Sequence, residues 1–272
     1  MTLPSDGEIA MAMRTVRETL VGKDVLRLVA TDGTFKGVVV REGHIAATET
    51  GDDVDRVWMA LHDAHARLDP SFFGYDGARA RFLKFFPLGF EDPEYARHER
   101  DYKIRAKTLV DTTVPLVDAK SGSPSGPAVV KAFQATNLLS PFEKVRLKDA
   151  LSGPRAHEFL ESAAAFAEGD IAGGLSGMAA ALRPYDSGKW TVVTYLPYFW
   201  HPETHMFLKP EVTIDYATRV GHRFARVYGS DLEPSVYECL LDLVASTRRE
   251  IEDLNPRDNI DIQSFLWTAA AY

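Results

Sequence analysis

The sequence has little sulfur and few long apolar runs. Its 272 residues include one cysteine, Cys239, which excludes a disulfide within the chain and any cysteine-rich zinc cluster. No window reaches the ~18 uninterrupted apolar residues that a membrane span needs. The N-terminus also lacks the basic start and apolar run of a signal peptide. We therefore expect a cytoplasmic protein with no membrane partner.

The sequence also lacks the common catalytic and nucleotide-binding motifs. It contains no Gly-x-x-x-x-Gly-Lys loop, no Gly-x-Gly-x-x-Gly, no Gly-x-Ser-x-Gly and no His-Glu-x-x-His. The run Gly-Gly-Leu-Ser-Gly at 173–177 carries no lysine and follows no clear strand, so it indicates close packing between helices. No cofactor is implied, and whether the protein is an enzyme stays open.

Charge is unevenly distributed along the chain. The formal net charge is −8, yet residues 61–150 hold 14 basic and 12 acidic residues, a net of +2. The remaining residues are acidic, which argues against a general nucleic-acid binder and leaves room for a local basic patch.

Helical spacing dominates the apolar pattern. Ile9, Met13, Val16 and Leu20 recur at steps of three and four, which predicts an N-terminal amphipathic helix. Ser140 and Glu143 form a capping box, with Pro141 at the first helical position. Asp92 is a further candidate helix cap, and either Asp52 or Asp53 is another.

Two short segments have the β-branched and aromatic composition of strands. We predict hairpins near residues 34–48 and near residues 190–208. The fold class that follows is α+β, predominantly helical, with two small groups of strands.

A single linker-like segment, Lys-Ser-Gly-Ser-Pro-Ser-Gly-Pro at 120–127, divides the chain. It suggests an N-terminal α+β region, 1–118, and a C-terminal helical region with the aromatic hairpin, 128–272. The alternative is one continuous domain in which 120–127 is a surface loop.

Two histidines flank a glutamate in the order His201-Pro202-Glu203-Thr204-His205. Proline at the second position favours a tight turn, which places this segment at the tip of the predicted hairpin. His201, Glu203 and His205 are also weak candidates for a metal-assisted hydrolytic site, although we assign no metal there because the local ligands are too few.

Other ionisable residues lie on predicted helices. His62 and His65 stand three apart on one helix face, where they form a polar edge or a pair of metal ligands. Glu99 falls on the apolar face of the helix that begins at Asp92, so it needs a partner or a raised pKa. We expect an ion pair with Arg79 or Arg81; a functional acid is the alternative.

The strongest functional signal is a basic–aromatic segment between residues 79 and 107. It has eight basic residues against five acidic ones, and several phenylalanines lie among them. Basic groups beside aromatic rings can bind phosphates and stack bases. The alternative is a solvated helix face beside core residues. The candidate ligand-binding residues are Arg79, Arg81, Lys84, Arg100, Lys103 and Lys107.

These observations favour a binding module for nucleic acid or another polyanion that uses this segment. The alternatives are a metal-assisted hydrolase near residues 201–205 and a scaffold protein that acts through its surfaces.

Overall fold

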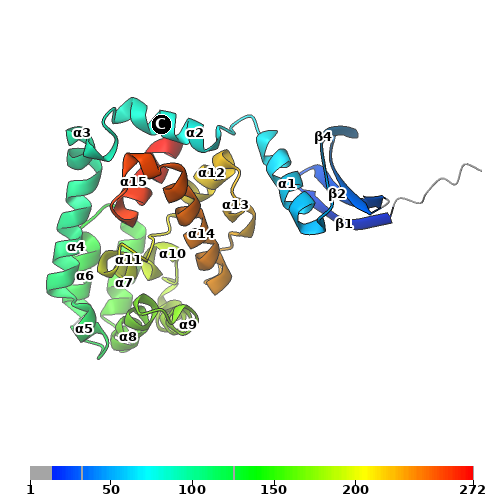
Figure 1. The fold of residues 1–272 in the computed structure, drawn as a ribbon. Helices are drawn as coiled ribbons and strands as arrows, with labels where there is room; N and C mark the ends of the chain where they lie inside the picture. Colours follow the sequence, from blue (N-terminus) through cyan, green and yellow to red (C-terminus); the bar gives the residue numbers. More distant parts are fainter. Residues whose placement is uncertain (1–13, 32, 125, 272) are drawn as a thin grey trace, which may run out of the picture. The chain divides into compact units, whose positions relative to one another are not determined.

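The structure is a computed structural model that describes residues 14–31, 33–124 and 126–271. The chain divides into two compact units, residues 1–72 and residues 73–272 (Figure 1). The division therefore falls near residue 72 rather than at 120–127, and the segment 120–127 lies inside the second unit. No helix in the described residues is long and apolar enough to cross a membrane.

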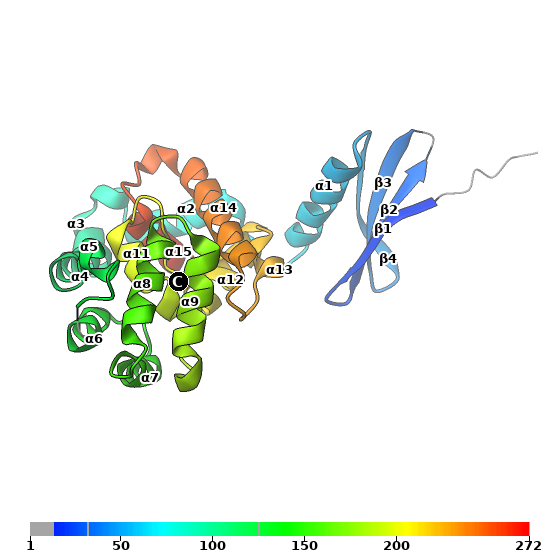
Figure 2. The ribbon, with the colours of Figure 1, turned by 90° about the horizontal axis from the view of Figure 1, so that it is seen from below.

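The first unit is a four-stranded antiparallel meander followed by one helix (Figure 2). Its strands are β1 (Arg14–Val21), β2 (Asp24–Thr31), β3 (Thr34–Arg41) and β4 (His44–Gly51). The predicted hairpin near 34–48 is confirmed, because β3 and β4 pair through a turn at Glu42 and Gly43. Both turn residues have positive φ, as two-residue hairpin turns require.

Helix α1 (Val54–Arg67) covers one face of this sheet. The Asp53 carboxylate accepts hydrogen bonds from the backbone N–H groups of Asp55 and Arg56, which confirms it as the helix cap. The small core below the helix is formed by Leu26, Val39 and Leu61. This core is fully buried, so burial of apolar area on one face of the sheet stabilises the unit.

The predicted N-terminal helix is wrong for its described part. Residues Arg14–Val21 form strand β1, and the first two residues of the expected pattern, Ile9 and Met13, lie outside the described residues. Val16 and Leu20 are exposed on the strand, whereas Arg17, Thr19 and Val21 are partly buried. The spacing of apolar residues was therefore misleading, because the strand is defined by its pairing with β2.

The described residues of the second unit form helices joined by loops and include no strand. The unit begins with α2 (Gly74–Phe85). A continuous helical stretch then runs from α3 (Pro93–Tyr95) to the end of α4 (Asp101–Thr113), and α5 (Leu116–Ala119) follows it. It continues with α6 (Gly126–Gln134), α7 (Pro141–Leu151), α8 (Ala156–Ala167), α9 (Ile171–Leu182), α10 (Trp190–Val193) and α11 (Tyr195–Trp200). It ends with α12 (Pro210–Val220), α13 (Phe224–Val227), α14 (Pro234–Glu250) and α15 (Asn259–Ala271). The capping box at Ser140 and the cap at Asp92 are both confirmed.

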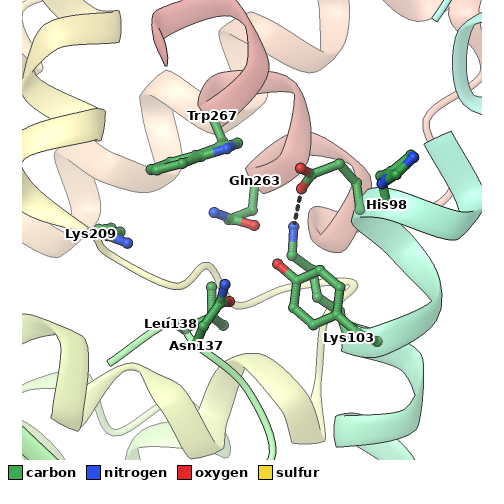
Figure 3. A pocket seen from close by; sticks show the side chains of 9 residues that line it. His98, Lys103, Asn137, Leu138, Lys209, Gln263 and Trp267 are labelled. Carbon is green, nitrogen blue, oxygen red and sulfur yellow. Dashed lines mark hydrogen bonds and ion pairs between the residues drawn. The ribbon is translucent and has the colours of Figure 1, made fainter. Parts of the chain in front are cut away.

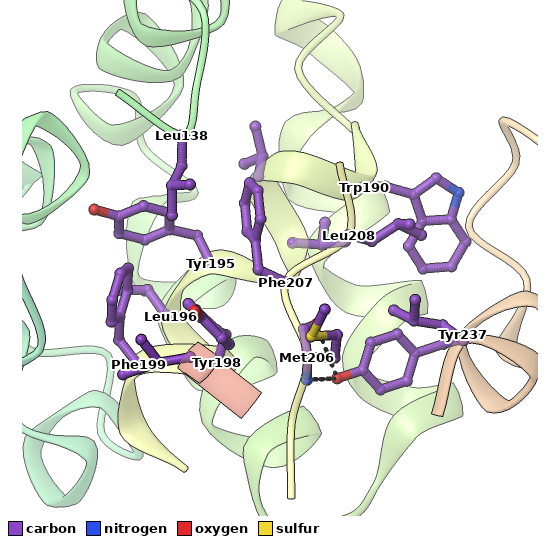
Figure 4. Packing of buried hydrophobic residues seen from close by; sticks show 14 of the residues in the cluster. Leu138, Trp190, Tyr195, Leu196, Tyr198, Phe199, Met206, Phe207, Leu208 and Tyr237 are labelled. Atoms are coloured by element: carbon purple, nitrogen blue, oxygen red, sulfur yellow. Dashed lines mark hydrogen bonds between the residues drawn. The ribbon is translucent and has the colours of Figure 1, made fainter. Parts of the chain in front are cut away.

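The predicted hairpin near 190–208 is wrong. Residues 190–200 form the short helices α10 and α11, and an extended segment follows them. Every residue of these helices is buried, and their aromatic side chains pack against Phe207, Leu208 and Tyr237 (Figure 4). An apolar run that is buried on all sides has no periodicity, so its composition alone cannot distinguish a strand from a buried helix.

The glycine-rich run at 173–177 lies in α9, where it packs on α8 as predicted. A Cβ atom added at Gly174 would lie 2.5 Å from the Phe166 Cβ, and one added at Gly177 would lie 2.2 Å from the Ser162 Oγ. The absence of side chains at these positions lets the two helices approach closely.

Replacing Gly174 by alanine should therefore destabilise the second unit. The new methyl group meets both the Phe166 side chain and its backbone, which cannot move without shifting α8. Overpacking of this kind costs about 1–3 kcal/mol, more than the gain in helix propensity. Thermal melting followed by circular dichroism measures the effect. Gly229→Ala is the control, because no atom lies within 4 Å of its added Cβ; equal melting temperatures for the two variants would contradict this account.

Candidate functional site

One buried carboxylate joins the last helix to the helix that carries most of the basic–aromatic segment. Asp261, in the first turn of α15, is fully buried. It accepts hydrogen bonds from the Arg100 Nη1 at 2.6 Å, from the Arg257 Nε at 2.9 Å and from the Tyr95 hydroxyl. Asp258 also pairs with Arg100 and accepts from the backbone N–H groups at the start of α15. Two guanidinium groups thus balance two carboxylates, as a buried charge network requires.

The network keeps its carboxylate ionised. Burial by itself would raise the pKa of Asp261, but hydrogen bonds from Arg257 and Tyr95 outweigh it and hold that pKa below its ordinary value. Burial by itself would lower the pKa of Arg100, but the bonds of Arg100 to Asp258 and Asp261 outweigh burial and raise that pKa. Both partners are therefore charged at neutral pH.

A π-helical turn lies in the helix beside this network. Residues Ala96–Arg100 have π-helical geometry between α3 and α4. Such a turn changes the direction of the side chains that follow it and is often found at functional sites. Here it carries His98 and Glu99, which line a small pocket together with Tyr102 and Lys103 of α4.

The pocket lies between α4, the loop after α6, the residue before α12 and α15 (Figure 3). Its volume is about 120 Å³. This is less than the ~300–1,000 Å³ of pockets that hold drug-sized ligands, so it accepts one small group. The lining residues are His98, Glu99, Tyr102, Lys103, Asn137, Leu138, Lys209, Gln263 and Trp267.

Lys103 is a buried amine at the wall of this pocket. Its side chain is 1% exposed, and its Nζ donates to the Glu99 Oε2 at 3.1 Å and to the Ser264 Oγ at 2.7 Å. Burial lowers the pKa of Lys103 to about 8, although the neighbouring Glu99 carboxylate opposes that shift. Lys103 is therefore the partner of Glu99, and the expected pairing of Glu99 with Arg79 or Arg81 is wrong.

Gln263 is the polar side chain of the pocket whose hydrogen bonding is incomplete. It is 5% exposed, and its Oε1 has no hydrogen-bond partner in the described part of the chain. Other buried polar groups of α15 are bonded, among them Asn259 and Ser264; Thr268 also has an unpaired oxygen but does not line the pocket. A buried amide oxygen without a partner costs roughly 1–3 kcal/mol, so a ligand that donates to it recovers that free energy.

Trp267 and Lys209 form the opposite side of the pocket. The Lys209 Nζ lies 4.9 Å from the centre of the Trp267 ring, and both side chains are half-buried. Figure 3 shows the Gln263 amide between Trp267 and Lys103, with Asn137 and Leu138 facing it. The pocket thus brings together an aromatic ring, an unpaired amide and two lysines.

The six basic residues predicted as ligands are mostly engaged within the protein. Arg79 pairs with Asp253, Lys107 pairs with Asp111, and Arg81 donates to the Ala269 carbonyl. Arg100 and Lys103 have the partners described above. Lys84 is exposed. Of the six, Lys103 alone lines the pocket.

The residues of the hydrolase hypothesis have structural contacts. His205 is buried; its Nε2 donates to the Ala167 carbonyl and its Nδ1 accepts from the Tyr237 hydroxyl. Burial lowers the pKa of His205, so the ring is neutral at pH 7. His201 lies 6.4 Å away between ring centres, and Glu203 is exposed. Among the described residues, no group of three or more histidine, cysteine, aspartate or glutamate side chains could hold a metal ion.

The two histidines of α1 belong to the first unit. The His65 Nε2 lies 3.0 Å from the Asp24 Oδ2, which also accepts from Arg41. The His62 ring packs edge-on against Trp58, 5.0 Å between centres. His65 therefore takes part in an ion-pair network that joins α1 to the sheet.

Comparison with family models, curated proteins and solved structures finds no match to this chain. The candidate site therefore rests on geometry. Four of its residues, Asn137, Lys209, Gln263 and Trp267, were not predicted from the sequence. They come from three separate segments, and no local spacing links them to Lys103.

Asp261→Asn should destabilise the second unit strongly. Removal of the charge leaves the largely buried Arg100 and the exposed Arg257 with one carboxylate partner fewer, and loss of one member of a buried pair costs about 3–5 kcal/mol. Urea unfolding at pH 7 measures the difference. Asp253→Asn, which breaks the exposed pair with Arg79, should cost about 1 kcal/mol or less.

The pH dependence of unfolding gives a second readout of the same network. Because the pKa of Asp261 is lower in the folded protein, its contribution is present above the unfolded pKa and is lost as pH falls through the folded value. The stability difference between the wild type and Asp261→Asn should therefore shrink as the pH is lowered below about 4. A difference that stayed constant down to pH 2 would contradict an ionised Asp261.

Proposed function

We propose that the second unit is a nucleic-acid-binding module that receives one unstacked base in the pocket and contacts the adjoining phosphate through Lys209. The observation that carries the proposal is the buried amide of Gln263, whose Oε1 is unpaired beside the Trp267 ring and the two lysines. A base offers the flat ring and the N–H groups that this combination suits, and the phosphate offers the negative charge.

The aromatic side chains support binding of a ring. Trp267 is half-buried at the pocket, and Tyr102 of α4 also lines the pocket. Stacking of a base on an aromatic side chain contributes about 1–3 kcal/mol per base. The cation–π contact with Lys209 holds the indole in place beside the pocket.

The charges of the pocket favour an anionic ligand. Lys103 is neutralised by Glu99, so Lys209 contributes the remaining lysine charge at this site. Arg79 and Arg100, outside the pocket, are already paired with carboxylates, so they contribute less positive charge to phosphate binding than the sequence suggests. We therefore expect few phosphate contacts and modest affinity.

The volume of the pocket restricts the form of the nucleic acid. A cavity of about 120 Å³ has space for one base and not for a stacked pair. Bases within a duplex are stacked and paired, so extracting one costs a few kcal/mol. Single strands and strand ends meet this requirement more readily than duplex DNA does.

The first test is binding of fluorescently labelled single strands, measured by anisotropy at low salt. The wild type should bind single strands more tightly than a duplex, and affinity should fall as salt rises, with a slope of roughly 0.7 per phosphate contact. Trp267→Ala and Lys209→Glu should each weaken binding by at least about tenfold, the first through lost stacking and the second through lost charge.

Lys84→Glu is the matched control for charge reversal. Lys84 is exposed in the same basic–aromatic segment but does not line the pocket, so its reversal should change affinity less than Lys209→Glu does. Melting curves for each variant separate lost binding from lost folding. If Lys84→Glu abolished binding and Lys209→Glu did not, the ligand would follow the outer segment, and the pocket proposal would be wrong.

Binding should also weaken as pH rises through about 8. In the free protein the pKa of Lys103 is lowered to about 8 by burial, and deprotonation leaves the Glu99 carboxylate without its counter-charge beside an anionic ligand. Anisotropy titrations between pH 7 and pH 9.5 measure this. Lys103→Met should bind more weakly at pH 7 and show a smaller loss of affinity across the same range; a wild-type affinity unchanged across that range would contradict the role given to Lys103.

A further inference from the structure

We infer that Lys103 is the amine nucleophile of a covalent site, and that its partner is the aldehyde of an open-chain sugar phosphate. The inference goes beyond nucleic-acid binding, because it assigns a reaction to the pocket. Such an aldehyde has two sources. An abasic nucleotide in a strand is the source that rests on the proposed function, whereas a free sugar phosphate does not depend on it.

The Lys103 amine lies where an imine-forming lysine needs to be. Its side chain is 1% exposed, yet it lines a cavity of about 120 Å³. Burial favours the neutral form of a lysine, and the neutral amine is the form that attacks a carbonyl carbon. The fold thus keeps the amine away from bulk water, while the cavity gives a small ligand access to it.

Glu99 is the proton acceptor and donor for this amine. Its Oε2 accepts from the Lys103 Nζ at 3.1 Å, and both residues line the pocket. A carboxylate within hydrogen-bonding distance of a reacting group can take up a proton and return it. The Ser264 Oγ accepts from the same Nζ at 2.7 Å, which fixes the amine relative to α15.

The reaction is imine formation, and it needs no oxidant or reductant. Glu99 takes one proton from the Lys103 ammonium group, and the Nζ lone pair then attacks the aldehyde carbon. A C–N bond forms as the carbonyl π electrons move to oxygen, and a proton passes from nitrogen to that oxygen. Glu99 returns its proton to the resulting hydroxyl group, which leaves as water while the C=N bond forms. One ammonium group and one aldehyde give one iminium ion and one water.

The other polar groups of the pocket define the ligand beyond its aldehyde. The buried Gln263 Oε1 has no partner among the described residues, so it can accept from a hydroxyl group. Lys209 supplies a positive charge for a phosphate. Figure 3 shows Lys103 and Lys209 on opposite sides of the Gln263 amide, which matches the order of aldehyde, hydroxyl and phosphate along a short sugar chain. An abasic nucleotide in its open form carries the same three groups.

The first test is reductive trapping with glyceraldehyde 3-phosphate and cyanoborohydride at pH 7, followed by peptide mapping. Reduction of the imine fixes the ligand on the nitrogen and raises the mass of the protein by that of the aldehyde less one oxygen atom. Lys103 should be labelled at least about tenfold more than the exposed Lys84, because burial leaves a larger share of its amine neutral. Equal labelling of the two lysines would overturn the inference.

Two variants separate the nucleophile from the phosphate contact. Lys103→Arg keeps the charge that pairs with Glu99 and removes the nucleophile, so trapping in the pocket should be lost. Lys209→Glu should lower the labelling of Lys103 by glyceraldehyde 3-phosphate about tenfold and leave labelling by glyceraldehyde, which has no phosphate, unchanged. Circular dichroism melts confirm that each variant is folded. The ratio of Lys103 to Lys84 labelling is measured within the wild type, so it decides the inference even if Lys103→Arg fails to fold.

Labelling of Lys103 should rise with pH up to about 8 and level off above it. Burial lowers the pKa of Lys103 to about 8; Glu99 and Asp261 oppose that shift, and Arg100 adds to it. Tyr102, whose ring centre lies 5.3 Å from the Nζ, stays uncharged because burial raises its pKa. Labelling of an exposed lysine continues to rise above pH 8, since such an amine titrates near pH 10. A profile for Lys103 that paralleled the exposed lysines would contradict a buried nucleophile.

The second test uses a single strand with one abasic site and the same reductant, and it is read on a denaturing gel. A covalent complex should form with the wild type and be lost with Lys103→Arg. A strand that carries a tetrahydrofuran ring in place of the abasic sugar is the control. That strand has no aldehyde, so it should bind in the anisotropy measurement without becoming linked.

The outcomes separate this inference from the proposed function. If single strands bind and neither aldehyde labels Lys103, the proposed function stands and the inference is overturned. If glyceraldehyde 3-phosphate labels Lys103 while no strand binds, the inference stands with a free sugar phosphate as its source, and the nucleic-acid proposal is overturned. Linkage of the abasic strand through Lys103 supports both and identifies the abasic nucleotide as a source.

Discussion

Asp261 is the residue on which the second unit depends most. A carboxylate with no solvent exposure is stable there only because two guanidinium groups, a phenol and a backbone N–H donate to it. These donors come from the helix around Tyr95 and Arg100 and from the turn before α15. The network therefore sets the position of α15 against α4, and those two helices together with the π-helical turn before α4 provide six of the nine residues that line the pocket.

The same constraint explains how the basic–aromatic segment is used. Arg79 and Arg100 pair with Asp253 and Asp258 of the acidic C-terminal region. Other basic residues of the segment pair with carboxylates one turn away on their own helix, namely Arg97, Lys103 and Lys107. The aromatic side chains of this segment fill the core, where Phe82, Phe86, Phe90 and Tyr95 contact one another. The segment is thus mainly structural, and the ligand-binding proposal concerns the pocket at its edge.

Gln263 differs from the other unpaired buried groups by its place. Among the described residues, Ser187, Tyr198 and Thr268 also have a buried oxygen without a hydrogen-bond partner, but they do not line the pocket. The desolvation of an unpaired amide is unfavourable unless something binds to it, and at Gln263 the pocket gives a ligand access. We propose a ligand site at Gln263 because its unpaired Oε1 does not stabilise the fold, whereas a bound ligand that donates a hydrogen bond would satisfy it.

The sequence by itself determined the elements whose signals are local. Asp92-Pro93 and the Ser140–Glu143 capping box mark helix starts because the capping bonds span only a few residues, and the turn at Glu42-Gly43 marks a hairpin for the same reason. Tertiary structure decided the rest. Strand β1 exists through pairing with β2, α10 and α11 are helices inside an apolar core, and Glu99 pairs with Lys103 rather than with a distant arginine. The pocket joins Lys103, Asn137, Lys209 and Gln263 across 160 residues of sequence. Contacts between such distant residues depend on how the helices pack, and no local pattern in a single sequence encodes that packing.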